Sequence, residues 1–164
     1  MSLLKFLIIH ESQTPKTMDV TGDHIREWHT SPKPKGRGWS RVGYSELFLR
    51  DGTVEKLQDY DEDKWVDSDE ITNGAAGYNG VSRHICLVGG IDDNGEASFG
   101  DFFDLYTDAQ FVRLQEYIKL FLGLHPTCKV LGHYQVNSHK TCPGFDVPEY
   151  LRLINIPEQY IFTE

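Results

Sequence analysis

Cysteine is scarce in this chain of 164 residues. It has three cysteines, Cys86, Cys128 and Cys142, all in the second half of the sequence. A disulfide framework needs an even set of paired cysteines, so this odd and sparse set argues against one. We therefore expect reduced thiols and synthesis in the cytoplasm, where thiols remain reduced.

Long apolar runs are also missing. No stretch approaches the roughly 20 apolar residues that a membrane-spanning helix needs. The apolar part of the N-terminal segment 1–12 is too short for a signal peptide, and no small-residue cleavage site follows it. We expect no membrane insertion. If the substrate lies outside the cytoplasm, another agent must release the protein.

Positive charge is low: 16 Lys and Arg residues against 25 Asp and Glu residues give a formal net charge of −9. Such a surface repels phosphate backbones, which excludes nucleic acid as the main partner. Hydrophobic residues make up 39% of the chain, enough for a core. The length is close to the roughly 100–150 residues of a typical domain, so we expect a single domain over 1–164, present as a monomer.

Hydrophobic patterning predicts strands interspersed with helices. Strands are expected at 3–9, 42–49, 53–57, 85–88 and 130–133, and the pair Asp51-Gly52 predicts a hairpin between the second and third. Helices are expected around Ile25 and Trp28, from a capping box at Thr107 and Gln110 onward, and at 147–155. This alternation predicts an α/β domain, in which helices pack on one sheet.

A long segment, 59–80, separates the hairpin from the next strand. Its first part, 59–70, is acidic. Long loops in small domains are often functional, so this part could fold over a cleft as a lid. A solvated surface is the simpler interpretation, and we favour it.

Histidine and cysteine side chains offer candidate metal ligands. His10 and His133 each lie at the end of an apolar run, where sheets present functional groups, and Cys142 follows in a segment flanked by Pro and Gly. Three nitrogen or sulfur ligands leave zinc a fourth position for water, which is the catalytic rather than the structural pattern. Each histidine could also be an ordinary surface or core residue, and spacing alone leaves both alternatives open.

A series of short motifs runs through the chain from residue 3 to about residue 153. In order, they are Leu7-Ile8-Ile9-His10, Val42-Gly43-Tyr44, Arg50-Asp51-Gly52-Thr53-Val54, Gly77-Tyr78-Asn79, Ile85-Cys86-Leu87-Val88-Gly89-Gly90 and Lys140-Thr141-Cys142-Pro143-Gly144-Phe145-Asp146. This ordered set resembles the N-acetylmuramoyl-L-alanine amidase family, in particular its phage lysozyme-type branch, which is related to the peptidoglycan recognition proteins. The resemblance implies a mixed central β-sheet flanked by helices, with a zinc cleft on one face.

The resemblance also implies roles for individual residues. His10 and His133 match the two histidine ligands of the zinc, and Cys142 matches the cysteine ligand of this branch. Tyr44 matches the tyrosine beside the catalytic water, and Lys140 matches the lysine that stabilises the tetrahedral intermediate. The implied reaction is hydrolysis of the amide bond between N-acetylmuramic acid and L-alanine in peptidoglycan.

Other positions near these motifs also receive assignments. We expect Asn79 and His29 to contact substrate, although a structural role on a helix face fits His29 equally well. Relatives often carry histidine where this chain has Ser45 and Gly74, which leaves the corresponding substrate contacts open. We interpret His84 as a packed residue or a neighbour of a metal ligand.

The implied biology is that of an endolysin, made in the bacterial cytoplasm and released to the wall through a holin-type lesion or lysis. The alternative is a protein that binds muropeptide without cutting it. Members of that kind typically lose the cysteine ligand, so the presence of Cys142 counts against this alternative.

Overall fold

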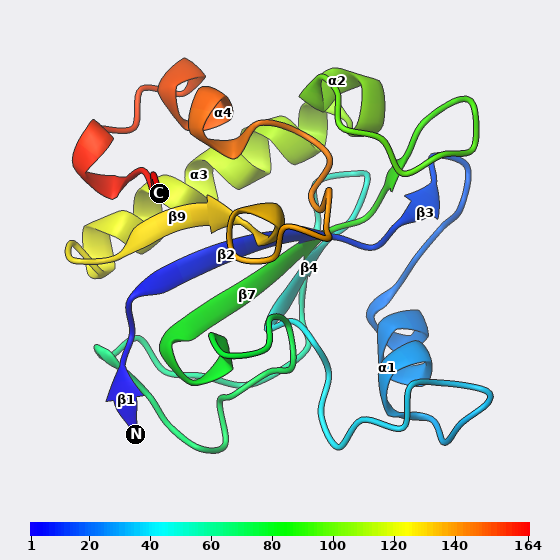
Figure 1. The fold of residues 1–164 in the computed structure, drawn as a ribbon, viewed down its shortest axis with the longest axis horizontal. Helices are drawn as coiled ribbons and strands as arrows, with labels where there is room; N and C mark the ends of the chain where they lie inside the picture. Colours follow the sequence, from blue (N-terminus) through cyan, green and yellow to red (C-terminus); the bar gives the residue numbers. More distant parts are fainter.

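The computed structural model describes all residues from 1 to 164, and its centre is a five-stranded sheet (Figure 1). The strand order is β5-β4-β7-β2-β9. These strands are β2 (Phe6–Glu11), β4 (Glu46–Phe48), β5 (Val54–Lys56), β7 (Ser82–Leu87) and β9 (Lys129–Gly132). Neighbours among β4, β7, β2 and β9 are parallel, and β5 joins β4 antiparallel. The sheet is therefore mixed, which confirms the expected fold class and the predicted hairpin.

Two short strand pairs lie outside this sheet. β1 (Ser2–Leu3) pairs with β6 (Trp65–Val66), and β3 (Thr14–Pro15) pairs with β8 (Gly90–Ile91). The prediction of one buried strand over 3–9 is thus wrong at its N-terminal end. Leu3 pairs with Trp65 and is 40% exposed, because the chain leaves the β1–β6 pair before it enters the central sheet.

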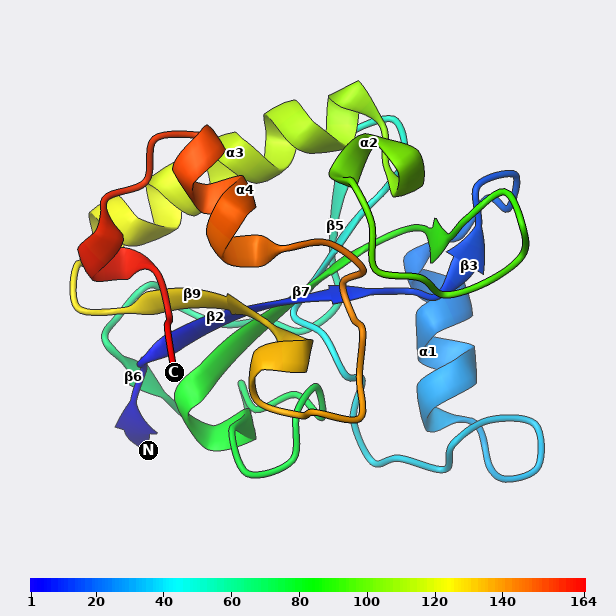
Figure 2. The ribbon, with the colours of Figure 1, turned by 45° about the horizontal axis from the view of Figure 1, so that its top comes forward.

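Three of the four α-helices cover one face of the sheet (Figure 2). These are α2 (Phe102–Leu105), α3 (Asp108–Leu124) and α4 (Val147–Leu153), whereas α1 (Gly22–Thr30) stands beyond the carboxyl ends of β2 and β7. Short 3-10 helices occur at η1 (Asn79–Val81), η2 (His133–Gln135) and η3 (Glu158–Tyr160). None of the helices combines the length and apolar character needed to span a bilayer.

The long helix α3 begins at the predicted capping box. The Thr107 hydroxyl accepts a hydrogen bond from the Gln110 N–H, and the Gln110 Oε1 accepts one from the Thr107 N–H. The buried Gln110 Nε2 also donates to the carbonyls of Phe48 and Val88, at 3.1 and 2.9 Å. One side chain therefore caps the helix and ties it to the sheet.

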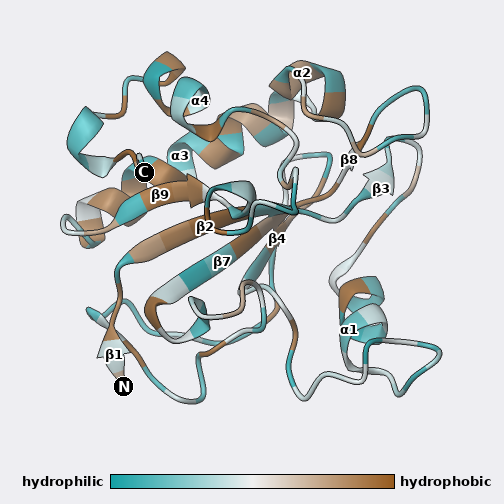
Figure 3. Ribbon diagram, viewed as in Figure 1, coloured by the Kyte–Doolittle hydropathy of each residue, from teal (hydrophilic) through white to brown (hydrophobic).

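The two faces of the sheet have different roles, because successive strand residues point to opposite sides. Leu7 and Ile9 of β2 belong to the main core with Leu114 and Ile118 of α3. The intervening Ile8 packs on the other face, in a smaller cluster. Figure 3 shows the apolar colouring of β2 and β9 within more polar surroundings. The helix-free face is thus available for polar side chains.

The acidic segment 59–70 is held at the side of the sheet. Glu62 accepts hydrogen bonds from Arg83 and His125, both at 2.9 Å, and the Arg83 guanidinium lies 3.7 Å from the centroid of the Tyr60 ring. No residue of 59–70 lines the cavity described below. This geometry supports the solvated-surface interpretation over the lid.

Candidate metal centre and active site

Three predicted ligands meet at the carboxyl end of the parallel strands. His10, His133 and Cys142 each offer one ligand atom, and these atoms all lie within 4.8 Å of one another. The Cys142 Sγ is 3.8 Å from the His10 Nδ1. In a tetrahedral zinc site with ordinary bond lengths, ligand atoms lie ~3.4–3.6 Å apart. A shift of about 1 Å or less would bring this set to that geometry, so the donor set fits zinc.

Each ligand is positioned by a different local structure. His10 is the penultimate residue of β2, which ends at Glu11, two residues beyond the predicted apolar run 3–9. His133 follows β9 directly and begins η2. Cys142 lies on the loop after η2, which crosses the helix-free face (Figure 1). The Glu11 N–H donates to the Cys142 Sγ at 3.2 Å, which fixes the sulfur beside the end of β2.

Burial sets the protonation of the three ligands. It lowers the pKa of His10 well below its usual value, with His84 and His133 adding to the effect. Burial, followed by the charge of Lys140, lowers the pKa of His133 to about 4. Burial and then the Glu11 carboxylate raise the pKa of the Cys142 thiol. The imidazoles are therefore neutral and ready to ligate, whereas the thiol must lose a proton to do so.

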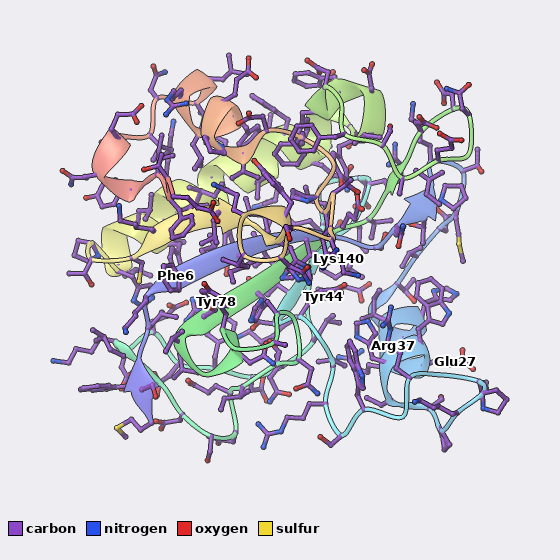
Figure 4. The ribbon with its side chains drawn as sticks, viewed as in Figure 1. Phe6, Glu27, Arg37, Tyr44, Tyr78 and Lys140 are labelled. Atoms are coloured by element: carbon purple, nitrogen blue, oxygen red, sulfur yellow. The ribbon has the colours of Figure 1, made fainter.

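A cavity of about 460 Å³ is lined by the three predicted ligands. Tyr44 and Lys140, both predicted to act in catalysis, line it and lie near one another in Figure 4. The Tyr44 ring centroid is 5.1 Å from that of His10. Burial raises the pKa of Tyr44 well above its usual value, so the phenol keeps its proton and is able to donate a hydrogen bond. The structure thus brings together the predicted catalytic and ligating residues.

The two predicted substrate contacts have different outcomes. His29 lines the cavity, but it is buried, and its Nδ1 accepts a hydrogen bond from the Gly43 N–H at 3.0 Å. Its ring packs against Trp39 and Tyr44, so it supports the cavity wall as well as lining it. Asn79 does not line the cavity; its Oδ1 accepts from the Ala75 N–H at 2.8 Å and organises the loop before η1.

Sequence reasoning missed several residues of the cavity. Glu11 lines it, is 7% exposed, and has its pKa raised to about 7 by burial, against the opposing charge of Lys140. In the sequence, the position of Glu11 directly after His10 was the signal that could have identified it. Trp39 and Arg37 also line the cavity, and the Arg37 guanidinium is 4.9 Å from the Trp39 ring centroid. No periodic pattern marks them, because both lie in a loop.

His84 lies beneath the ligands and is fully buried. Its Nδ1 is 2.9 Å from the His10 Nε2, and burial lowers the pKa of His84 to about 3. His84 is thus packed, as predicted, and lies directly beside His10, one of the predicted ligands.

A second cavity, of about 620 Å³, lies beside α2 and α4. Aromatic residues dominate it, and no histidine or cysteine lines it. It lacks the groups that the chemistry of the first cavity requires.

Comparison with known proteins agrees with this site. Residues 2–145 match the family described as N-acetylmuramoyl-L-alanine amidase. The endolysin of Escherichia phage T7 is 35% identical over 147 residues, which cover 88% of this chain and 83% of the relative. The endolysin of Klebsiella phage KP32 is 35% identical over 146 residues, with the same coverage of 88% and 83%.

Solved structures show the same fold. The amidase LysC from Clostridium intestinale superposes with a TM-score of 0.70 at 18% identity, over 95% of this chain and 88% of that one. Drosophila PGRP-LB in complex with tracheal cytotoxin gives 0.69 at 20% identity, over 99% and 86%. By its sequence match over most of its length, and with the expected fold, this chain belongs to the N-acetylmuramoyl-L-alanine amidase family and is an enzyme of that family.

Proposed function

We propose that this enzyme is a zinc-dependent endolysin that cuts the amide bond between N-acetylmuramic acid and L-alanine in peptidoglycan. The observation that carries the proposal is the meeting of His10, His133 and Cys142 at a cavity that Tyr44 and Lys140 also line. Family membership supplies the reaction class, and the cavity supplies a place where it can occur.

The donor set supports zinc as the cofactor. Two imidazole nitrogens and one thiolate suit this ion, and three protein ligands leave one position free, as in catalytic rather than structural sites. Bound there, zinc would lower the pKa of a water molecule toward neutrality and polarise the scissile carbonyl. His10, His133 and Cys142 would hold it.

Lys140 and Tyr44 would stabilise the reacting amide. Negative charge develops on the carbonyl oxygen as the amide is attacked, and donors aimed at that charge act more strongly in the transition state than in the ground state. Lys140 provides a cation at the cavity, and Tyr44 provides a phenol that burial keeps protonated. We assign both as catalytic residues.

Peptidoglycan is the proposed substrate because proteins similar to this chain are named as endolysins and peptidoglycan recognition proteins. The cavity wall that carries Trp28, His29 and Trp39 offers aromatic surface, and Arg37 offers a cation. Such a wall suits a substrate that combines sugar rings with carboxylates. Asn79 is not part of this proposal, since its side chain is used within its own loop.

We further propose that the enzyme acts as a monomer without membrane insertion. It would be made in the bacterial cytoplasm and reach the wall after release by a holin-type lesion or lysis. A comparison of lytic activity on whole and on permeabilised cells tests this route. Equal activity on both would contradict it.

Digestion of purified sacculi tests the function itself. The protein with zinc should release free peptide stems while the glycan strands remain intact. Cys142→Ala should abolish both metal binding and release. Lys140→Ala should retain the metal and slow release. Binding of muropeptide without any release by the zinc-loaded protein would refute the enzyme and favour a recognition protein.

A further inference from the structure

A fully buried histidine in the middle of a strand needs an explanation. His84 lies in β7, two residues before Cys86, and both side chains point to the helix-free face beside β2. It is 0% exposed, and its Nε2 is buried without a protein partner. An apolar residue would fill such a position without leaving a polar atom unpaired. Packing alone therefore does not account for a histidine here.

The other ring nitrogen of His84 contacts a proposed ligand. Its Nδ1 is 2.9 Å from the Nε2 of His10, and the ring centroids are 5.1 Å apart. The opposite nitrogen of His10, Nδ1, is 3.8 Å from the Cys142 Sγ. One nitrogen of His10 is thus directed at the proposed metal position and the other at His84.

Ligation of zinc through the His10 Nδ1 would fix the tautomers of both imidazoles. To ligate through Nδ1, His10 needs an unprotonated Nδ1, so its proton is on Nε2. That proton would be donated to the Nδ1 of His84, which would then carry its own proton on Nε2. A hydrogen bond from the remote nitrogen of a ligating histidine orients the ring and raises its affinity for metal.

The neighbouring loop is shaped to leave room for this ring. A Cβ on Gly74 would lie 2.4 Å from the His84 Nδ1, 2.5 Å from its Cγ and 2.8 Å from the Gly43 carbonyl oxygen. Gly74 is not among the glycines with positive φ, so its backbone conformation does not require glycine. The requirement is one of space, which the His84 ring fills together with the Gly43 carbonyl oxygen.

From these contacts we infer that His84 is a positioning residue, which holds His10 in the orientation and tautomer that ligate through Nδ1, and that Gly74 is glycine to admit its ring. The inference rests on the proposed metal site. It assigns a role to two residues that neither touch the metal nor need to touch the substrate.

Two substitutions at His84 separate positioning from packing. His84→Asn retains an acceptor oxygen near the place of Nδ1, whereas His84→Leu has similar bulk and no acceptor. Zinc affinity, measured by competition with a chromophoric chelator, should fall about 10–100-fold in His84→Leu, the usual effect of removing such a partner. It should stay within about threefold of the parent protein in His84→Asn. Nitrogen-15 chemical shifts of the zinc-loaded protein should show ligation through His10 Nδ1 in the parent and a loss of that single state in His84→Leu.

Gly74 provides an independent arm. Gly74→Ala should displace the ring and weaken zinc binding as His84→Leu does. In a His84→Ala background the same change should weaken zinc binding much less, because the ring is gone and only the contact with the Gly43 carbonyl oxygen remains. This non-additivity would show that the two residues are directly coupled. If a variant at position 84 fails to fold, the zinc affinity of Gly74→Ala still tests the inference.

The outcomes separate this inference from the proposed function. A parent protein that binds zinc, with unchanged affinity and His10 signals in His84→Leu and Gly74→Ala, would overturn the inference and leave the amidase intact. Equal loss in His84→Asn and His84→Leu would also overturn it, since packing would then be the cause. A parent protein that binds no zinc would refute both.

Discussion

Zinc binding at pH 6.0 should release few protons from the histidines and one from the cysteine. Burial lowers the pKa of His133 to about 4 and that of His10 well below its usual value, so both rings are already neutral at this pH. Burial raises the pKa of the Cys142 thiol, so it still carries its proton. The perturbation is therefore the addition of zinc to the metal-free protein, and the readout is a proton count.

The count follows from these protonation states. A ring with a pKa near 4 is ~1% protonated at pH 6.0, so two rings contribute almost nothing. The thiol contributes about one proton, and a water whose pKa falls to about 7 contributes about 0.1. Histidines at their ordinary pKa of about 6.5 would be ~75% protonated and would add about 1.5 protons. Neutral histidines thus predict the release of about 1.1 protons per zinc, whereas histidines at their ordinary pKa predict about 2.6.

Glu11 must be removed from this count. Burial raises its pKa to about 7, so it is mostly protonated at pH 6.0 and would lose some of that proton beside a bound cation. The measurement therefore uses the Glu11→Gln variant. Calorimetric titration in two buffers of different ionisation enthalpy gives the number of protons released.

A value near 2.6 in Glu11→Gln would refute the conclusion that burial keeps the two histidines neutral. A value near zero would refute a protonated Cys142. As a control, any zinc binding that survives in Cys142→Ala with Glu11→Gln should release only about 0.1 proton.

Three further predictions concern catalysis and stability. Lys140→Ala should lower kcat on peptidoglycan about 100-fold and change zinc affinity less than threefold; a parallel loss of zinc would contradict its catalytic role. In metal-free protein, Glu11 has a folded pKa of about 7 against 4.5 in the unfolded chain, so its stabilising contribution is full below pH 4.5 and lost as pH rises through 7. Urea unfolding in the presence of a chelator should show a decrease of up to ~3 kcal/mol in the free energy of unfolding as pH rises through 7, and this decrease should be absent in Glu11→Gln. The same pH dependence in both proteins would contradict a buried carboxylic acid at Glu11. Gln110→Leu should destabilise the fold by about 2–4 kcal/mol, because it removes the buried hydrogen bonds from Gln110 Nε2 to the carbonyls of Phe48 and Val88 and the cap on the Thr107 N–H. Thermal unfolding checks this, and an unchanged Tm would contradict it.

Features that depend on local sequence could be predicted. The Thr107 capping box, the hairpin at Asp51-Gly52 and the apolar run of β2 each follow from side chains close together in the chain. His10 and His133 could be singled out as candidates because each follows an apolar strand, and parallel strands present their carboxyl ends at one edge. Their role as ligands, together with Cys142, was implied by the resemblance to the amidase family.

Features that depend on distant packing could not be predicted. The contact of His84 with His10 requires the register of β7 against β2, and the space it needs at Gly74 requires the fold of a loop. Arg37 and Trp39 reach the cavity only because their loop folds back beside α1. These residues carry no periodic signal, since a loop position is set by what it packs against.

The substrate contact of Asn79 stays a prediction, and the structure shows a local hydrogen bond of its side chain. Its motif suggested a substrate contact, but an asparagine side chain at a turn readily bonds to nearby backbone, here the Ala75 N–H. This hydrogen bond holds the Asn79 side chain within its own loop, and Asn79 is not among the residues that line the cavity.

X-ray absorption at the zinc edge tests the central claim most directly, that two imidazoles and one thiolate hold one zinc with a position left open. The loaded protein should show one sulfur at about 2.3 Å and three lighter ligands at about 2.0–2.1 Å, of which two scatter as imidazoles. Cys142→Ala should remove the sulfur. A zinc shell without sulfur, or one filled by four protein ligands, would contradict the proposed centre.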